Sequence, residues 1–165
     1  MVARVKTHSR KVGLYMSVHI DKNSVLFYKA CEDIWAADRV LAGSPNIAVW
    51  LCTQAVEKIL KGFLQCNNIS YDSSHELEPL LEEVVFLVKL SDECKTNVLN
   101  ISIYKSGLRY KNMSNDPSLE DARLVIKRTK QIISEFNGLP KISSFMDEAR
   151  EVHVKMVNAN IDTVK

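Results

Sequence analysis

The segment from Ser44 to Cys66 constrains the fold of this 165-residue chain more than any other. Ser44 followed by Pro45 is a strong helix start, because serine caps free backbone amides and proline fits the first turn. The residues that follow recur at helical spacing and are apolar around most of the circumference, which is typical of the central helix of a bundle. At this length we expect one domain that buries about two-thirds of its unfolded surface.

Five further segments carry amphipathic helical periodicity. Ser118 with Asp121 three residues later is a capping-box-like start for one of them. Helices are expected from Ser24 to Gly43, from residues 74–76 to Val88, from Ser91 to Leu108, from Ser118 to Gly138, and after Pro140. Short connections force neighbouring helices to run antiparallel, so the sequence predicts an all-α, antiparallel up-and-down helical bundle of five to six helices.

The N-terminal residues follow a different pattern. Residues 12–20 alternate between apolar and polar side chains, which predicts a strand. A single strand cannot satisfy its own backbone, so we interpret residues 1–23 as an extended arm that packs on the helices, pairs with a second copy or is mobile. The remainder divides into the bundle at 24–140 and a C-terminal helix at 141–165, which packs on the bundle or on a dimer partner.

The charge and hydropathy of the sequence argue against two properties: general binding to nucleic acid or anionic membranes, and a membrane-spanning segment. The 22 Lys+Arg and 20 Asp+Glu residues leave a net charge of +2, too small to draw the whole protein onto nucleic acid or an anionic membrane. No run approaches the ~18 apolar residues that a membrane span needs. We therefore expect a cytoplasmic protein whose nucleic-acid site, if it has one, is a local patch.

Recognisable metal and catalytic motifs are absent from the sequence. The 4 cysteines form no C-x-x-C pair, and the 4 histidines have no i, i+4 spacing. Buried free thiols are expected, and neither a metal nor another cofactor is. The chain contains no P-loop, G-x-G-x-x-G, G-x-S-x-G or H-E-x-x-H motif, so the common enzyme classes with a sequence signature find no support.

The central helix carries a polar stripe. Gln54, Lys58, Lys61 and Gln65 fall on one face, and Glu57 stands four residues before Lys61. Spacing alone favours a solvated stripe with one weak Glu57–Lys61 ion pair over a binding surface.

Arg109 and Tyr110 form a second candidate site, in a segment rich in Asn, Ser and Asp. The guanidinium suits a phosphate and the ring offers a stacking plane. An arginine that caps a helix, or that pairs with Asp116 or Asp121, explains the same pattern equally well.

Two other groups of residues have a simpler interpretation. Arg123, Lys127 and Lys130 share one face of the helix expected at 118–138, with Arg128 at its edge. A charged outer face explains them better than RNA binding does. His75 stands at a helix start, where we expect it to cap rather than to catalyse.

In their order along the chain, these residues resemble the HEPN family of small helical domains. The matching positions are Ala30, Asp33 and Ala37 in the first helix, Gln54, Ala55, Glu57, Lys58 and Lys61 in the second, SHELEPLL with His75 and Leu77 at the third, and Arg109 with Tyr110 after the fourth. The resemblance covers about residues 24–137. It implies an antiparallel bundle, often a homodimer, that binds a nucleotide or RNA and is commonly encoded beside a small nucleotidyltransferase as a toxin–antitoxin pair. The stripe on the central helix, with Arg109 and Tyr110, becomes the expected binding face.

The resemblance also implies a sequence motif by which nuclease activity can be judged. Many members are metal-independent endoribonucleases that use an arginine followed, after four to six intervening residues, by a histidine. Counting from Arg109, that histidine falls at 114–116, where this chain has Ser114, Asn115 and Asp116. None of these side chains replaces imidazole as an acid and base near neutral pH. We therefore expect RNA cleavage to be weakened or lost, while Arg109 still binds an anion. Two alternatives remain. One is a metal-independent endoribonuclease with an unconventional or weakened site, and the other is a structural dimer in which the stripe is an interface and the arm a clasp.

Overall fold

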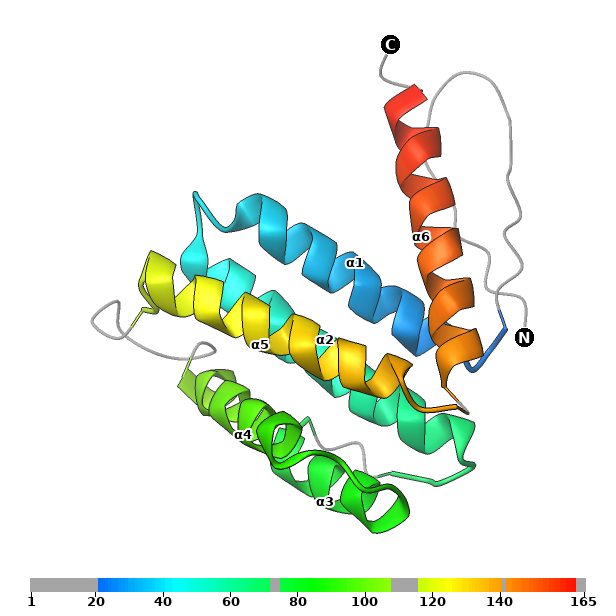
Figure 1. Cartoon of the computed structure of the whole chain (residues 1–165). Helices are drawn as coiled ribbons and strands as arrows, with labels where there is room; N and C mark the ends of the chain where they lie inside the picture. The colour runs from blue at the N-terminus through cyan, green and yellow to red at the C-terminus, as the bar shows by residue number, and fades with distance from the viewer. Residues whose placement is uncertain (1–20, 72–74, 108–115, 141, 163–165) are drawn as a thin grey trace.

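The computed structural model describes residues 21–71, 75–107, 116–140 and 142–162, without the side chains of 105–107, 157 and 159–162. Within these ranges the chain forms six α-helices and no strand, so the predicted all-α bundle is confirmed (Figure 1). The helices are α1 (Val25–Val40), α2 (Pro45–Cys66), α3 (Leu77–Leu87), α4 (Asp92–Gly107), α5 (Leu119–Asn137) and α6 (Ser143–Asp162). The strand expected at 12–20, most of the arm and Leu108 lie outside the described residues.

The central position of α2 is confirmed. It contacts α1, α3, α4 and α5, and its bounds are the predicted ones. The expected side-chain cap at Ser44 is wrong: its hydroxyl makes no cap hydrogen bond, and its ψ of 76° falls short of the extended backbone that caps adopt. Ser118, with ψ of 166°, has that geometry and forms the predicted capping box with Asp121. Asn68, in the left-handed conformation at φ 58°, turns the chain after α2.

The other helix ends differ from the prediction by a few residues. α1 ends at Val40 rather than Gly43, and a turn follows in which the carbonyl of Val40 accepts the amides of both Gly43 and Ser44. α3 has Pro79 in its first turn, and it ends at Leu87 rather than Val88. Ser91 caps the next helix by accepting the amide of Cys94 at 3.0 Å.

One hydrophobic core runs along α2. Phe27 from α1 is fully buried against it, and Phe63 of α2 meets Phe136 of α5 edge-on with ring centroids 5.7 Å apart. Leu119 is 37% exposed, because it is the first residue of α5. The core therefore depends on residues further along α5, including Val125 and Ile132.

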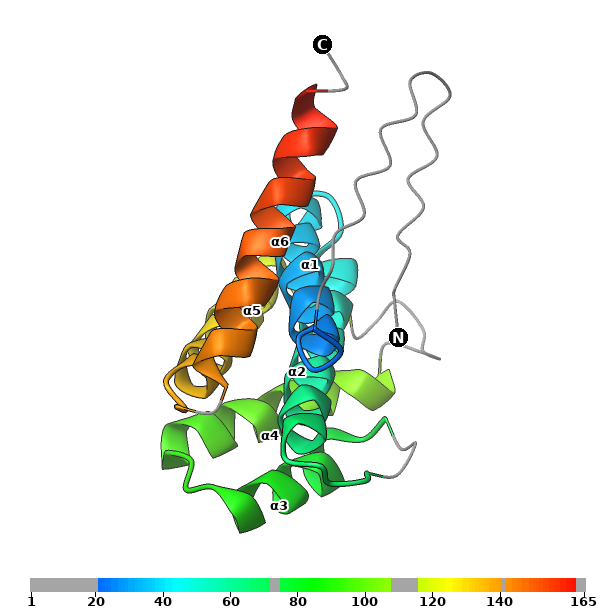
Figure 2. The same ribbon diagram turned by 90° about the vertical axis from the view of Figure 1, so that its right-hand side faces the viewer.

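The C-terminal helix α6 packs mainly on α1 and rises past the other helices (Figure 2). Met146, Ala149 and Val152 are its buried contacts. Glu148 fixes its first half: the Ser24 hydroxyl donates to one carboxylate oxygen, and the Asp21 amide donates to the other at 3.3 Å. No described helix combines the length and the apolar character that crossing a bilayer requires.

Candidate functional site

The polar stripe of α2 is half-buried, and the solvated stripe favoured by spacing alone is wrong. Glu57 is only 5% exposed, and the side chain of Lys61 is 12% exposed. The stripe is shielded from solvent because α1 packs along α2 and because the chain after α2 returns to place His75 against Glu57. We call Gln54, Glu57, Lys58 and Lys61 the α2 face.

Glu57 is the centre of this face. Its Oε1 accepts a hydrogen bond from Lys61 Nζ at 2.7 Å and lies 2.8 Å from Nδ1 of His75. Since an ionised carboxylate only accepts, Nδ1 is the donor of the second contact. The Lys61 ammonium also lies 5.7 Å from the centre of the Tyr71 ring. One buried carboxylate thus holds a lysine from its own helix and a histidine from the segment before α3.

His75 therefore does not have the capping role expected from its position. The N-cap of α3 is Glu76, which makes no side-chain cap hydrogen bond. The His75 side chain is 57% exposed, with Nδ1 turned to Glu57. Such an arrangement fixes the ring and leaves Nε2 directed away from the carboxylate.

A second ion pair joins the α2 face to α1. Lys58 donates to Asp33, whose side chain is 16% exposed against 26% for that of Lys58. Burial raises the pKa of the Asp33 carboxyl above its usual range, and the hydrogen bond and charge of Lys58 oppose that shift. Asp33 was marked in the sequence only by its place in the family resemblance, because nothing in local spacing connects it to Lys58.

The two glutamines of the stripe have different environments. The Gln65 amide donates to the carbonyl of Lys22 at 3.0 Å. Nε2 of Gln54 is shielded from solvent and has no hydrogen-bond partner in the part of the chain that the structure describes. A buried amide without a partner is unusual and costs stability.

Two of the predicted site residues, Arg109 and Tyr110, lie outside the described residues, as do Ser114 and Asn115. Their proposed contacts with a phosphate and a base stay predictions. Asp116 is described and exposed. The structure therefore brings together the four residues of the α2 face, and adds Asp33 and His75 to them.

The thiols take no part in this site. None of the four cysteines forms a disulfide bond, and Cys52, Cys66 and Cys94 are buried as predicted, whereas Cys31 is half-buried. Burial raises the pKa values of Cys52 and Cys94 to about 12, so both remain protonated near neutral pH. In the described residues, no three side chains among His, Cys, Asp and Glu gather in a way that holds a metal ion.

The fold and this face define the class of the protein: a helical-bundle domain with a half-buried ionic network on its central helix. The chain belongs to the HEPN domain family, which matches residues 24–139. The predicted resemblance is confirmed, and the match spans α1 to α5 without α6. No curated protein and no solved structure matches the chain.

Proposed function

We propose that this HEPN domain binds a nucleotide or RNA at the α2 face. The residues assigned to the site are Gln54, Glu57, Lys58 and Lys61 of that face, with Arg109 and Tyr110 from the segment after α4. The observation that carries the proposal is the network centred on the carboxylate of Glu57, a residue that is only 5% exposed.

Such a network is poorly explained by stability alone. Removing charges from water costs several kcal/mol per ion, and apolar side chains of similar volume often stabilise a protein equally well or better. α2 is otherwise apolar over most of its surface, so Lys58 and Lys61 interrupt a helix that has no structural need of them. Networks of this kind gather at functional sites.

Each residue has a chemical role in the proposal. Asp33 and Glu57 partly neutralise the two lysines, which then act as oriented hydrogen-bond donors more than as free charge. Binding exposes the unpartnered amide of Gln54, which is shielded in the free protein, and a ligand oxygen then accepts its hydrogen bond. Arg109 supplies the bidentate phosphate contact, and Tyr110 the plane on which a base stacks.

Ligand-induced stabilisation tests the proposal. ATP, GTP or a short RNA at about 100 times its Kd is expected to raise the melting temperature by roughly 5–10 °C. Arg109→Ala should remove the shift, while Arg150→Ala, which alters an exposed arginine of α6, should keep it. Gln54→Leu should weaken the shift without lowering the melting temperature of the free protein, because the amide is unsatisfied there. The absence of a shift with every nucleotide and RNA would reject the proposal.

Partners are proposed on the family resemblance. A small nucleotidyltransferase is the proposed protein partner in a toxin–antitoxin type pair, and a homodimer is the proposed assembly. In the competing hypothesis the protein is only a structural dimerisation module. That hypothesis expects no nucleotide effect at all, so the melting experiment separates the two.

A second candidate function is metal-independent RNA cleavage, and the contact between His75 and Glu57 favours it. A carboxylate at Nδ1 orients the ring and leaves Nε2 for proton transfer, as in many acid–base sites. This histidine lies in the sequence before Arg109 rather than at the expected positions 114–116.

The cleavage experiment uses purified protein and RNA in the presence of a chelator. His75→Gln is expected to reduce the rate by roughly a hundredfold or more, since a positioned acid or base contributes at least that much. Arg109→Ala should abolish cleavage, and His153→Gln, an alteration on α6, should leave it unchanged. Equal degradation by wild type and all variants points to a contaminating nuclease and counts against this candidate.

A further inference from the structure

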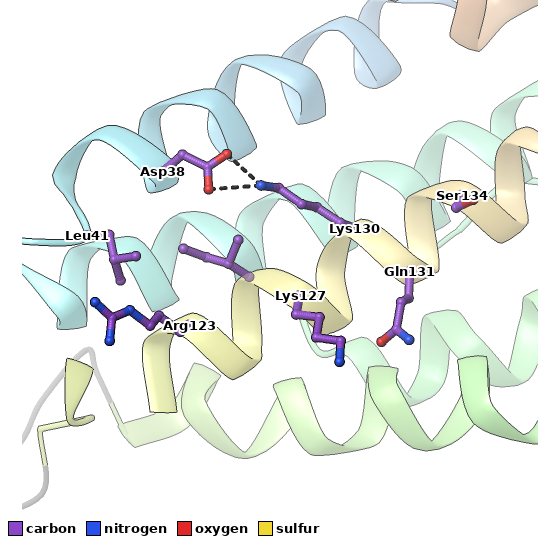
Figure 3. A pocket seen from close by; sticks show the side chains of 8 residues that line it. Asp38, Leu41, Arg123, Lys127, Lys130, Gln131 and Ser134 are labelled. Carbon is purple, nitrogen blue, oxygen red and sulfur yellow. Dashed lines mark hydrogen bonds and ion pairs between the residues drawn. The ribbon is translucent and has the colours of Figure 1, made fainter. Parts of the chain in front are cut away.

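A second basic surface lies where α5 passes the C-terminal half of α1. A groove of about 490 Å³ is lined there by Asp38, Leu41, Arg123, Ile126, Lys127, Lys130, Gln131 and Ser134. Figure 3 shows Lys130 reaching across to Asp38, while Arg123 and Lys127 extend from the same helix without meeting a carboxylate among the residues drawn. We call these residues the α5 groove.

Few acidic side chains neutralise the basic side chains of this groove. Between Ala122 and Ser134, α5 carries four basic side chains and no acidic one, although the whole protein has a net charge of only +2. Asp38 engages Lys130 at 2.7 Å, and these side chains are 45% and 50% exposed. Among the described residues, neither Arg123 nor Lys127 has an ion-pair partner.

Three acids that border this stretch of α5 are engaged elsewhere, and Glu120, one turn before Arg123, forms no ion pair with it in the described part of the chain. Asp121 is occupied by the capping box with Ser118, and Glu135 accepts from the amide and hydroxyl of Ser91. Glu93 of α4 accepts the Gln131 amide at 3.0 Å. The positive charge therefore stays concentrated between the first and last turns of α5.

The kinds of side chain in the groove match one ligand class. Arginine, lysine, glutamine and serine are the residues that contact phosphate and sugar oxygens in nucleic-acid complexes. Arg123 and Lys127 stand one helical turn apart, about 6 Å along the axis, and Lys130 continues the row. Leu41 and Ile126 give the groove an apolar base on which a ribose or a base edge packs.

We infer that the α5 groove binds the phosphodiester backbone of single-stranded RNA, as a surface separate from the α2 face. On α1, Asp33 pairs with the α2 face and Asp38 lines the α5 groove. The two residues are five positions apart, so they point about 140° apart around the helix. The inference goes beyond the proposed function, since it stands even if the α2 face takes only a mononucleotide.

Salt-dependent binding of a labelled oligouridylate of about 12 nucleotides tests the inference, with fluorescence anisotropy as the readout. Arg123→Gln/Lys127→Gln is expected to weaken binding by roughly tenfold or more. It should also lower the slope of log K against log salt by roughly 1.4, because two phosphate contacts are lost. Asp38→Asn should strengthen binding roughly two- to fivefold by freeing Lys130, a gain that misfolding does not produce.

The matched control is Lys22→Gln/Lys89→Gln, which removes the same charge from exposed positions outside the groove. An equal loss in this control would overturn the inference, because general charge would then explain the binding. No binding by the wild type, or displacement by polyglutamate as readily as by unlabelled RNA, would overturn it as well. The thermal shift with ATP is measured on the same variants, and its retention separates failure of the groove from failure of the α2 face.

Discussion

Glu57→Ala is expected to lower the free energy of unfolding by about 3 kcal/mol, because it leaves the half-buried ammonium of Lys61 without its carboxylate. The side chains of Lys61 and Glu57 are 12% and 7% exposed, and the contact distance is 2.7 Å. His75 loses its orienting partner at the same time. Urea denaturation gives the change in stability, and nucleotide addition reports whether the α2 face still binds.

The chain contains a matched control for this substitution. Glu151 and Lys155 form a pair with the same residue types and the same spacing on α6, but their side chains are 73% and 61% exposed and 3.6 Å apart. Glu151→Ala should therefore cost less than about 1 kcal/mol. Glu57→Leu/Lys61→Met should recover most of the stability lost in Glu57→Ala, because no uncompensated charge remains. A cost at Glu57 no larger than at Glu151 would contradict the buried network.

Phe27→Ala should lower the free energy of unfolding by about 4 kcal/mol through the cavity that it leaves. Phe27 is fully buried where α1 crosses α2, and it packs directly over Gly62. A Cβ built on Gly62 lies 2.9 Å from Cε1 of the Phe27 ring, so only glycine permits this approach. Thermal or urea unfolding measures the loss.

Phe86→Ala is the control, because Phe86 is 94% exposed and its truncation should change stability by less than about 0.5 kcal/mol. Gly62→Ala adds a coupling test. It should be destabilising in the wild type, where the ring blocks the new methyl group, and nearly neutral in the Phe27→Ala background. Equal costs of Gly62→Ala in both backgrounds would argue against the close contact.

Local sequence signals were sufficient for the helices themselves. Pro45, the capping pair of Ser118 and Asp121, and Ser91 mark starts that the structure confirms, because caps and first turns depend on residues three or four positions apart. Apolar spacing likewise identified α2 as the central helix. The errors, at the Ser44 cap and at the ends of α1 and α3, fall at helix ends, where the backbone responds to the neighbouring chain.

The site was only partly predictable for the same reason. Helical spacing correctly placed Glu57 beside Lys61, but it reports which residues share a face and not what covers that face. The partners that bury the α2 face come from elsewhere in the chain: Asp33 pairs with Lys58 across 25 residues, and His75 reaches Glu57 across 18. The pair of Lys130 and Asp38, which borders the α5 groove, spans 92.

The sequence by itself thus determined the helices, the central place of α2, the residues that share its polar face and the family. Only the tertiary structure decided that this face is half-buried and that His75 holds Glu57 instead of capping α3. It also turned the charged side of α5 into one wall of a groove. The physical reason is that periodicity is a local property of one helix, whereas burial and ion pairing depend on which helices pack together.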